Sequence, residues 1–388
     1  MSDRIFRMFG VSEGSPEWND WHWQYRNRIM DADRLSSVLD LSETERKNIS
    51  ACLKKFRMTV TPYYFSLIDP DDPDDPIRAQ AIPSVREMET FPEEMADPLC
   101  EDSASPVRNI VHRYPDRVLF LVTRCCAMYC RHCTRRRLVG EEDVSISNEE
   151  LDEAIDYIKR TPEIRDVLVS GGDPLTLSDE RLNYILSRLR EIEHVEIIRI
   201  GTRIPVTMPM RVTPKLLDIL KKYQPIWINT HFNHPKELTN NSIKACASIV
   251  DAGIPLGNQS VLLRGVNDDT EIIKDLMLGL IRARVRPYYL YQCDLSEGLE
   301  HFRTDVRVGI DIIAELRGSI TGFAIPQFVI DAPGGGGKIP MNPEYIVSID
   351  DEKVVMKNHL GQIYEYPQPE KEIMNPIIHV RPVSNKPR

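Results

Sequence analysis

The sequence predicts an α/β fold built around an incomplete parallel (β/α) barrel. Short runs rich in β-branched residues recur through the middle of the chain, and amphipathic segments of helical period separate them. The runs cover residues 118–123, 166–170, 195–200, 226–229, 256–263 and 285–291. Six such units are too few to close the standard eight-fold barrel, so we expect a (β/α)6 barrel that is open at one side.

Helix start signals support the segments between these runs. Ser147-Asn-Glu-Glu150 is a capping box, in which the serine and the glutamate each satisfy a free backbone N–H group at the helix start. Thr213-Pro214 combines an N-cap residue with proline at the first helical position. Both signals predict helices that return the chain to the next strand.

The regions before and after the barrel are expected to differ in secondary structure. Residues 1–107 are expected to be mainly helical, with helix starts at Ser15-Pro16 and at the capping box Ser42–Glu45, and with the proline-interrupted run Asp69–Pro76 as a solvated connector. We assign residues 108–331 to the barrel. Residues 332–388 are expected to hold a glycine-rich loop, short β segments at 344–350, 353–357 and 362–366, and a tail.

Composition and charge narrow the class of function. The formal net charge of −10 over 388 residues argues against a broad surface for RNA or DNA, so a small-molecule substrate is expected. No apolar run approaches the roughly 20 residues of a membrane span, and the N-terminus lacks the apolar core of a signal peptide. Eight cysteines in a chain of this length do not resemble a secreted disulfide framework, so we expect a cytoplasmic protein.

Three cysteines follow the first predicted barrel strand within eight residues, in the stretch Cys126-Ala-Met-Tyr-Cys130-Arg-His-Cys133. Structural zinc sites normally have four protein ligands, whereas an iron–sulfur cube held by three cysteines leaves one iron open for another ligand. The spacing therefore favours an iron–sulfur cluster. Reduced core cysteines, or zinc with a distant fourth ligand, remain alternatives, and Cys125 is expected to be a packing residue.

Polar residues follow the later strands at the end where a parallel barrel carries its chemistry. They are Ser170-Gly-Gly-Asp173, Thr202-Arg203, Thr230-His231, Asn258-Gln259, Tyr291 and Asp294. Each of them taken alone has a simpler explanation, such as a satisfied core histidine, a solvated arginine or a tight turn at Gly171-Gly172. Their common position predicts one site at the barrel mouth.

A second unusual stretch, Asp331-Ala-Pro-Gly-Gly-Gly-Gly-Lys338, follows the apolar run 323–330. It is not a phosphate-binding P-loop, because Ile339 stands where Ser or Thr is required. A flexible hinge would explain the glycines. A lysine on such a loop is also what a Schiff base to pyridoxal phosphate requires, since the amine must move.

With both stretches in hand, the chain resembles the lysine 2,3-aminomutase family of the radical S-adenosylmethionine superfamily. The resemblance runs from about residue 112 to 365. Its most specific pieces are His112-Arg-Tyr-Pro-Asp-Arg117, Cys130-Arg-His-Cys-Thr-Arg-Arg-Arg137, Ser170-Gly-Gly-Asp-Pro-Leu175, Cys293-Asp-Leu-Ser296, Gly298-Leu-Glu-His-Phe-Arg303 and the loop 331–338. It implies a homo-oligomer that binds a 4Fe-4S cluster, S-adenosylmethionine and pyridoxal phosphate, and that receives one electron from an external donor.

The resemblance also assigns expected roles to residues. Cys126, Cys130 and Cys133 would hold the cluster, and Lys338 would form the internal aldimine. The set expected around S-adenosylmethionine is His132, Ser170, Gly171, Gly172, Asp173, His231 and Gln259. The set expected around pyridoxal phosphate is Arg113, Tyr114, Arg117 and Tyr291. Arg135 matches the arginine that grips the substrate carboxylate, and Asp294 and Asp331 match the pair that receives the lysine ammonium.

This pair of aspartates predicts the substrate. Two carboxylates in one cavity favour a cationic side chain, and the related glutamate aminomutases replace them, although either aspartate alone could instead cap a strand or a helix. The expected reaction moves the amino group of L-lysine from the α- to the β-carbon after a 5′-deoxyadenosyl radical removes a β-hydrogen. Alternatives are a relative acting on glutamate, arginine or a protein-bound lysine, or a non-catalytic iron–sulfur or zinc module.

The chain departs from the family at one point. Some clostridial members bind structural zinc through C-terminal cysteines, but this chain has no cysteine after Cys293, and Asp269 lies where the barrel-side ligand would be. We therefore expect no zinc, and the form of the oligomer stays open.

Overall fold

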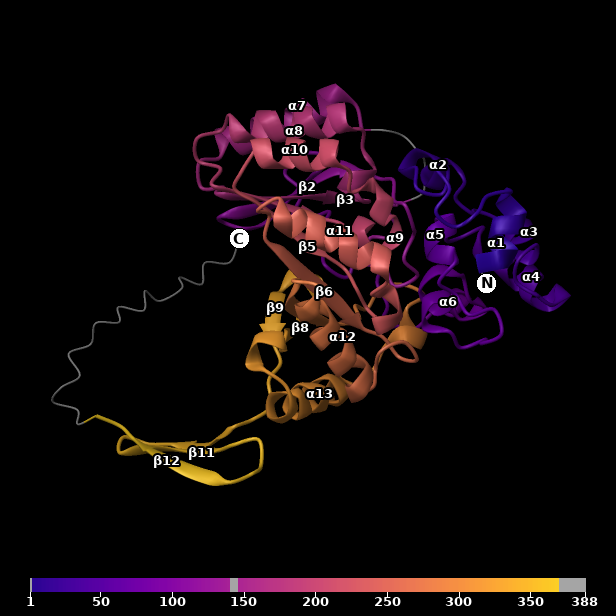
Figure 1. Ribbon diagram of the computed structural model, residues 1–388. Helices are drawn as coiled ribbons and strands as arrows, with labels where there is room; N and C mark the ends of the chain where they lie inside the picture. The colour runs from indigo at the N-terminus through magenta and orange to yellow at the C-terminus, as the bar shows by residue number, and fades with distance from the viewer. Residues whose placement is uncertain (1, 140–145, 370–388) are drawn as a thin grey trace.

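The computed structural model describes residues 2–139 and 146–369, and its centre is the expected open barrel (Figure 1). The parallel strands are β2 (Arg117–Thr123), β3 (Asp166–Gly171), β4 (Ile197–Gly201), β5 (Ile226–Thr230), β6 (Leu256–Leu262), β7 (Arg286–Gln292) and β8 (Gln327–Ala332). They lie in sequence order, as in a barrel rather than in a doubly wound sheet. Antiparallel strands β1 (Ile110–Tyr114) and β9 (Gly337–Pro340) end the described sheet, so the barrel does not close.

Amphipathic helices cover the outside of this sheet. The main ones are α7 (Asn148–Arg160), α8 (Asp179–Arg190), α10 (Pro214–Lys222), α11 (Asn240–Asp251), α12 (Thr270–Arg282) and α13 (Val306–Ser319). They complete six βα units before β8, and Figure 1 shows α7, α8 and α10 side by side. Both predicted starts are confirmed, since Ser147 forms its capping box with Glu150 and Thr213 caps α10.

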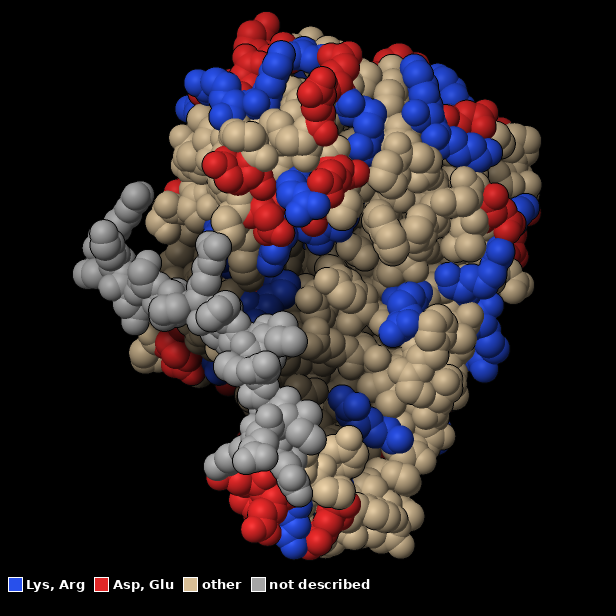
Figure 2. All heavy atoms as spheres, turned by 90° about the vertical axis from the view of Figure 1, so that its left-hand side faces the viewer, with Lys and Arg blue, Asp and Glu red and all other residues tan. Residues whose placement is uncertain are grey.

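The two faces of the strands differ in burial, and this difference positions the site. In β3, Val167 and Val169 are fully buried, whereas Asp166, Leu168 and Ser170, which alternate with them, are only partly buried. Strand β6 alternates in the same way and leaves Gln259 on the less buried face. One face of the sheet therefore packs against the helices, and the other faces the inside of the barrel. Seen from the left-hand side of Figure 1, the surface is hollowed near its centre, with Lys or Arg side chains inside the hollow (Figure 2).

The N-terminal region packs beside the barrel as several short helices. They are α1 (Ser2–Phe9), α2 (Trp21–Arg26), α3 (Ala32–Ser36), α4 (Glu43–Cys52), α5 (Pro62–Phe65), α6 (Pro76–Ala81) and the 3-10 helix η1 (Val85–Met88). A further short helix, α9 (Ile204–Thr207), belongs to the barrel and follows β4. The capping box at Ser42 is confirmed. Of the residues in these helices and their connections, Arg28, Thr59 and Gln80 hydrogen-bond the cysteine loop at the backbone atoms of residues 126, 129 and 131.

Two expectations for this region are wrong. Ser15 does not begin a helix, because residues 15–19 form hydrogen-bonded turns in which the Ser15 hydroxyl accepts from the Trp18 N–H group. The run Asp69–Pro76 is not a fully solvated connector. Asp75 is completely buried, caps α6 and pairs with Lys236 at 2.9 Å, and Pro76 is the first residue of that helix. The rigid φ of proline suits this first position.

The expected C-terminal β segments form a separate antiparallel sheet of three strands, β10 (Ile346–Ile349), β11 (Lys353–Lys357) and β12 (Ile363–Pro367). Figure 1 shows this sheet standing away from the barrel. The apolar side chains of its outer strands are exposed: Ile349 is 60% exposed and Ile363 is 58% exposed. Within residues 2–139 and 146–369, no helix is long and apolar enough to cross a membrane.

Candidate active site

The cysteine loop begins directly after β2 and lies at the carboxyl ends of the barrel strands. Burial raises the pKa of the Cys126 thiol, and it raises the pKa of Cys133 to about 11. Burial therefore disfavours the thiolate forms unless a positive charge compensates, and bound iron supplies such a charge. One protein cation already lies there, since Arg203 Nη1 is 2.8 Å from Cys130 Sγ. Three partly buried thiols on one loop beside an arginine fit the expected cluster.

Arg203 connects this loop to the interior. Its guanidinium also bonds Glu237 at 2.7 Å and Gln80 at 2.5 Å, and its backbone N–H donates to Asp173. Glu237 is fully buried and accepts a further bond from the Tyr64 hydroxyl. The strand-end position of Arg203 indicated a site residue, but the sequence did not assign it a role. In the structure, the positive charge of Arg203 lies next to Cys130, one of the three cysteines expected to bind the cluster.

His132 and His231 come together, with ring centroids 5.3 Å apart. Asn233 joins them: its Oδ1 lies 3.0 Å from His231 Nε2, and its Nδ2 lies 3.2 Å from His132 Nε2. Burial lowers the pKa of both imidazoles, that of His231 to about 3, so both rings are neutral at pH 7. Because the amide Nδ2 donates, His132 Nε2 accepts and Nδ1 carries the proton. This buried Nδ1 has no hydrogen-bond partner in the described chain, as expected where a polar ligand binds.

Gly171, the last residue of β3, and Gly172 lie too close to neighbouring backbone for any side chain to fit. A Cβ atom at Gly171 would lie 2.2 Å from the Thr123 carbonyl oxygen, and one at Gly172 would lie 2.2 Å from the Cys125 carbonyl oxygen. These glycines therefore let the turn pass close to the backbone of the chain that leads into the cysteine loop. Ser170 lies, half-buried, near the end of β3, and Gln259 lies, half-buried, on β6.

Asp173 is used by its own surroundings. Its carboxylate accepts from the Thr202 hydroxyl at 2.6 Å and from the backbone N–H groups of Arg203 and Leu175. Burial raises its pKa to about 6. These bonds tie the turn after β3 to the end of β4, so the side chain has a positioning role visible in the structure.

Lys338 lies opposite Asp331 on the paired strands β9 and β8. Its Nζ bonds both carboxylate oxygens, at 3.0 and 2.8 Å, and lies 5.1 Å from the centre of the Tyr291 ring. The Tyr114 hydroxyl accepts a bond from the Lys338 backbone N–H at 3.3 Å, and Arg117 stacks on the Tyr114 ring at 3.8 Å. The structure thus brings four of the residues expected around pyridoxal phosphate together.

Arg113 and the glycine loop lie beside this group. Arg113 donates to the Leu99 carbonyl, and its Nε would lie 3.9 Å from a Cβ at Gly335. Gly337 has a positive φ of 84°, and a Cβ there would approach the Tyr114 hydroxyl to 2.9 Å. Only glycine lets the loop pass the tyrosine in this conformation. An open cradle of aromatic and cationic side chains next to a lysine fits pyridoxal phosphate.

The substrate residues connect the two halves of the site. Thr134, next to Cys133, donates to Asp294 at 2.5 Å, and Asp294 in turn interacts electrostatically with Asp331 and Lys338. Burial, with a contribution from the Asp331 charge, raises the pKa of Asp294 to about 6. The cysteine loop, the aspartate pair and Lys338 therefore form one continuous site.

Arg135 is held by a residue that sequence reasoning missed. Its guanidinium bonds Glu101 through Nε at 3.0 and 2.9 Å and through Nη2 at 2.6 Å, and Glu101 is only 5% exposed. Among the residues that the structure describes, none hydrogen-bonds Nη1, which is the unengaged end of the fork. No local motif marks Glu101, because it meets Arg135 only through the fold.

Asp269, at the position where some family members have a zinc ligand, caps α12 instead. Its carboxylate accepts hydrogen bonds from the N–H groups of Glu271 and Ile272. In residues 2–139 and 146–369, no group of three or more His, Cys, Asp or Glu side chains is arranged to hold a single metal ion. The prediction that the chain binds no zinc stays a prediction.

The sequence is similar to known families and proteins. Residues 120–277 match the model of the radical SAM superfamily, and residues 313–381 match a lysine-2,3-aminomutase model. The chain is 55% identical to the L-lysine 2,3-aminomutase of Clostridium subterminale over 95% of its own length and 88% of that protein. It is 52% identical to that of Bacillus subtilis (92% and 76%) and 46% identical to the glutamate 2,3-aminomutase of Clostridioides difficile (94% and 86%).

Solved structures are more distant. Streptococcus suis SuiB bound to S-adenosylmethionine has a TM-score of 0.44 at 14% identity, over 56% of this chain and 51% of that one. A radical SAM methyltransferase from Sphaerobacter thermophilus has a TM-score of 0.42 at 16% identity, over 84% and 91%. The family rests on the sequence matches, which extend over nearly the whole chain. The chain belongs to the lysine 2,3-aminomutase family of the radical SAM superfamily.

Proposed function

We propose that this enzyme interconverts L-lysine and L-β-lysine, using a 4Fe-4S cluster, S-adenosylmethionine and pyridoxal phosphate. The observation that carries the choice of substrate is the contact between Asp331 and Lys338. A lysine ammonium is already held there by both carboxylate oxygens, in a site whose second carboxylate is Asp294. This site binds the functional group that ends a lysine side chain. It opposes the carboxylate of glutamate by charge.

The residues divide the work of binding between the two ends of the substrate. Arg135, oriented by Glu101, presents Nη1 to the substrate carboxylate, and Asp294 and Asp331 receive the ammonium. Thr134 fixes the Asp294 carboxylate, so that its position is set before substrate binds. Gripping both ends fixes the carbon chain between them, and such positioning lowers the barrier of the reaction.

The bound groups supply the chemistry that side chains lack: a radical that removes a hydrogen atom, and a carrier that bridges nitrogen between adjacent carbons. For the cluster we assign Cys126, Cys130 and Cys133, with Arg203 beside Cys130. For S-adenosylmethionine we assign His132, through its unpartnered Nδ1, together with Ser170, Gly171, Gly172, Asp173, His231 and Gln259. For pyridoxal phosphate we assign Lys338, Tyr114, Tyr291, Arg113 and Arg117.

The location, assembly and domain organisation of the protein are also part of the proposal. We infer a cytoplasmic homo-oligomer without zinc, served by an external one-electron donor. Its parts are an N-terminal region of residues 1–107, a barrel of residues 108–331, and a C-terminal part of residues 332–388 that carries the lysine loop. The exposed apolar side chains of the small sheet support self-association.

Lys338→Ala tests the proposal. We expect the variant to retain its iron and its capacity to cleave S-adenosylmethionine, but to lose formation of β-lysine by at least about a hundredfold, because the covalent anchor of the carrier is gone. Borohydride reduction of the wild-type protein with pyridoxal phosphate should label the peptide that contains Lys338. Lys357→Ala, at an exposed position on β11, is the matched control and should keep full activity. Unchanged turnover in Lys338→Ala would remove this lysine from the mechanism.

A further inference from the structure

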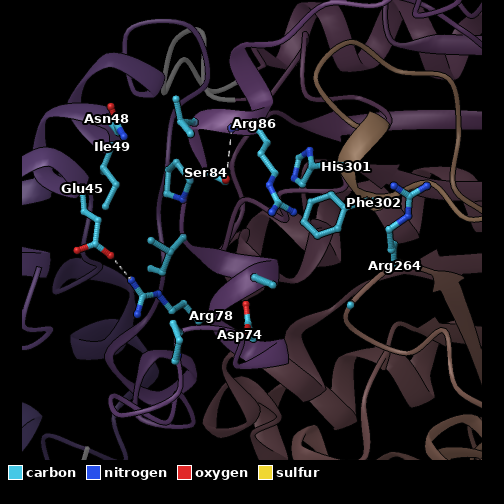
Figure 3. Close-up of a pocket in the computed structure, with 16 residues that line it drawn as sticks. Glu45, Asn48, Ile49, Asp74, Arg78, Ser84, Arg86, Arg264, His301 and Phe302 are labelled. Atoms are coloured by element: carbon cyan, nitrogen blue, oxygen red, sulfur yellow. Dashed lines mark hydrogen bonds and ion pairs between the residues drawn. The ribbon is translucent and has the colours of Figure 1, made fainter. Parts of the chain in front are cut away.

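A cavity of about 410 Å³ lies between the N-terminal region and the chain segments that follow β6 and β7. It lies outside the site described above. Figure 3 shows Arg86, His301, Phe302 and Arg264 on one side of it, and the Glu45–Arg78 ion pair on the other. The N-terminal region therefore brings the charged residues of η1 next to the segments that follow two barrel strands.

Aromatic rings lead from this cavity to the cysteine loop. The rings of His301 and Phe302 lie 4.1 Å apart between centroids. Phe302 is 3% exposed, and its ring meets that of His132 edge to face at 6.5 Å. His132 stands between Cys130 and Cys133 in the cluster loop. An unbroken series of ring contacts thus joins a surface cavity to the residues that we assign to the cluster.

The surface around the outer end of this series is cationic and partly apolar. Arg86 and Arg264 are exposed, and in the described part of the chain neither guanidinium has an ion pair or a hydrogen bond. Val85 and Met88, on the same short helix as Arg86, are 49% and 40% exposed. Apolar contacts bordered by unpaired charges are typical of transient protein interfaces, in which the charges steer the partner.

We propose that this surface is the docking site of a small acidic electron-carrier protein, and that the rings of His301, Phe302 and His132 form the route by which its electron reaches the cluster. One electron leaves the reduced carrier, which becomes oxidised by one electron, and the cluster becomes reduced by one. No atom is transferred. The inference rests on the proposed function, because only a redox cluster in the cysteine loop needs such a route.

Two physical reasons favour this surface. Electron transfer slows steeply with distance, so a donor must come close to the cluster loop, and the ring series shortens the gap across a buried region. A carboxylate-rich carrier would meet Arg86 and Arg264, whereas the molecule as a whole has a net charge of −10 and repels acidic proteins elsewhere. The acidic Asp74 lines the cavity away from Arg86, on the side of Arg78 (Figure 3).

Binding is the first test. A purified flavodoxin, oxidised and fluorescently labelled, is titrated with the reconstituted protein at low ionic strength. Arg86→Glu/Arg264→Glu should weaken its binding at least about tenfold, and added salt should abolish the difference, because exposed charges are screened. Arg160→Glu/Arg282→Glu changes the net charge equally on exposed helix ends far from the cavity and should bind like the wild type. Equal weakening by both double variants would contradict a local docking site.

Electron delivery is the second test, read from the bleaching of cluster absorbance on mixing with reduced flavodoxin. Arg86→Glu/Arg264→Glu should bleach slowly with flavodoxin and at the wild-type rate with dithionite, which needs no docking surface. Phe302→Leu should bind flavodoxin normally but bleach more slowly, and Phe302→Tyr, which keeps the ring, should restore the rate. A wild-type rate in Phe302→Leu would overturn the ring route.

The two proposals can fail separately. If dithionite-reduced wild-type protein makes no β-lysine, the proposed function fails, while the binding and bleaching measurements still decide the docking site. If β-lysine forms but the double variant binds flavodoxin and bleaches like the wild type, the docking site is wrong and the function stands.

Discussion

The carboxyl group of Asp294 lies in the interior, where Thr134 donates to it and Asp331, Lys338 and Arg135 act on it electrostatically. Burial, with a contribution from the charge of Asp331, raises its pKa to about 6, while Thr134, Lys338 and Arg135 oppose this shift. A carboxyl group with a raised pKa is neutral in mildly acidic solution and becomes charged as the pH approaches 7. Its ability to hold a cation therefore changes within the working range of an enzyme.

The pH dependence of substrate binding follows from this pKa. The affinity for L-lysine should rise by up to about tenfold per pH unit from pH 5 to 6 and level off above pH 7, because Asp294 gains its charge in that interval. Equilibrium dialysis of labelled lysine with the loaded enzyme measures it. His231, whose pKa burial lowers to about 3, is neutral throughout the interval. Affinity that is flat between pH 5 and 7 would contradict a role for Asp294.

Asp294→Asn should raise the KM for L-lysine by about tenfold to a hundredfold, since a hydrogen bond to a charged group is lost from a buried site. It should also remove the pH dependence, although Asp173, whose pKa is also raised to about 6, is still present. Asp305→Asn removes one charge at an exposed helix cap and serves as the control. A pH profile that survives in Asp294→Asn would assign it to Asp173 instead.

Sequence reasoning reached some of these residues and missed others for a physical reason. Asp331 and Lys338 stand at the two ends of one conspicuous loop, so the sequence singled out both residues, although it did not predict that they pair on adjacent strands. Glu101 and Asn233 carry no local pattern. Glu101 meets Arg135 across 34 residues, and Asn233 meets His132 across 101, so only the folded chain reveals them.

At the scale of elements, the turn after β3 supports the cysteine loop by backbone contact. Gly172→Ala would place a Cβ 2.2 Å from the Cys125 carbonyl oxygen, and we expect a loss of about 3 kcal/mol in the free energy of unfolding. The iron content after reconstitution should fall with it, because the cysteine loop must shift. Urea unfolding and iron analysis measure the two effects.

Gly322→Ala is the matched control for this substitution. Nothing lies within 4 Å of a Cβ at that position, and its φ is not positive, so the change should stay within about 0.5 kcal/mol. If Gly172→Ala keeps both its stability and its iron, the cysteine loop does not depend on this contact.

The elements themselves were predictable where the hydrophobic period was long. All six expected barrel strands and both expected barrel helix starts are present. The edge strands β1 and β9 were not expected, because five and four residues at the sheet margin carry no clear alternation. The serine and proline at Ser15-Pro16 mimic a helix start, but the following residues close short turns instead of propagating a helix.

At the scale of the whole molecule, the small C-terminal sheet exposes a set of large apolar side chains. They are Ile346, Val347, Ile349, Leu360, Ile363, Tyr364 and Tyr366, each more than half exposed. A three-stranded sheet that exposes so much apolar surface gains stability by packing against another surface. A second copy of the chain is the partner that we propose.

Ile349→Glu/Ile363→Glu should shift the protein toward monomers, because charges at the centre of an apolar interface lose their water. Light scattering after size-exclusion chromatography measures the mass. Ile243→Glu, on the outer helix α11, should leave the assembly unchanged. A monomeric wild-type protein, or a double variant that stays assembled, would contradict self-association through this sheet.

The N-terminal region and the barrel are coupled through buried charge. Glu87 on η1 is 1% exposed at its side chain and pairs with Arg131 at 2.5 Å and with Arg136, both in or next to the cysteine loop. Helix-start signals predicted helices for this region but gave no reason to place them against the loop. That placement depends on pairs that are 44 and 49 residues apart.

The amino acid that the enzyme rearranges can be identified by a direct assay. The protein is reconstituted anaerobically with iron and sulfide, supplied with pyridoxal phosphate, S-adenosylmethionine and dithionite, and given L-lysine, L-arginine or L-glutamate separately, with β-amino acids followed by chromatography. We expect β-lysine from L-lysine and no β-product from the other two. β-Glutamate or β-arginine in place of β-lysine would contradict the role of Asp294 and Asp331, and no β-product from any of the three would contradict the proposed reaction.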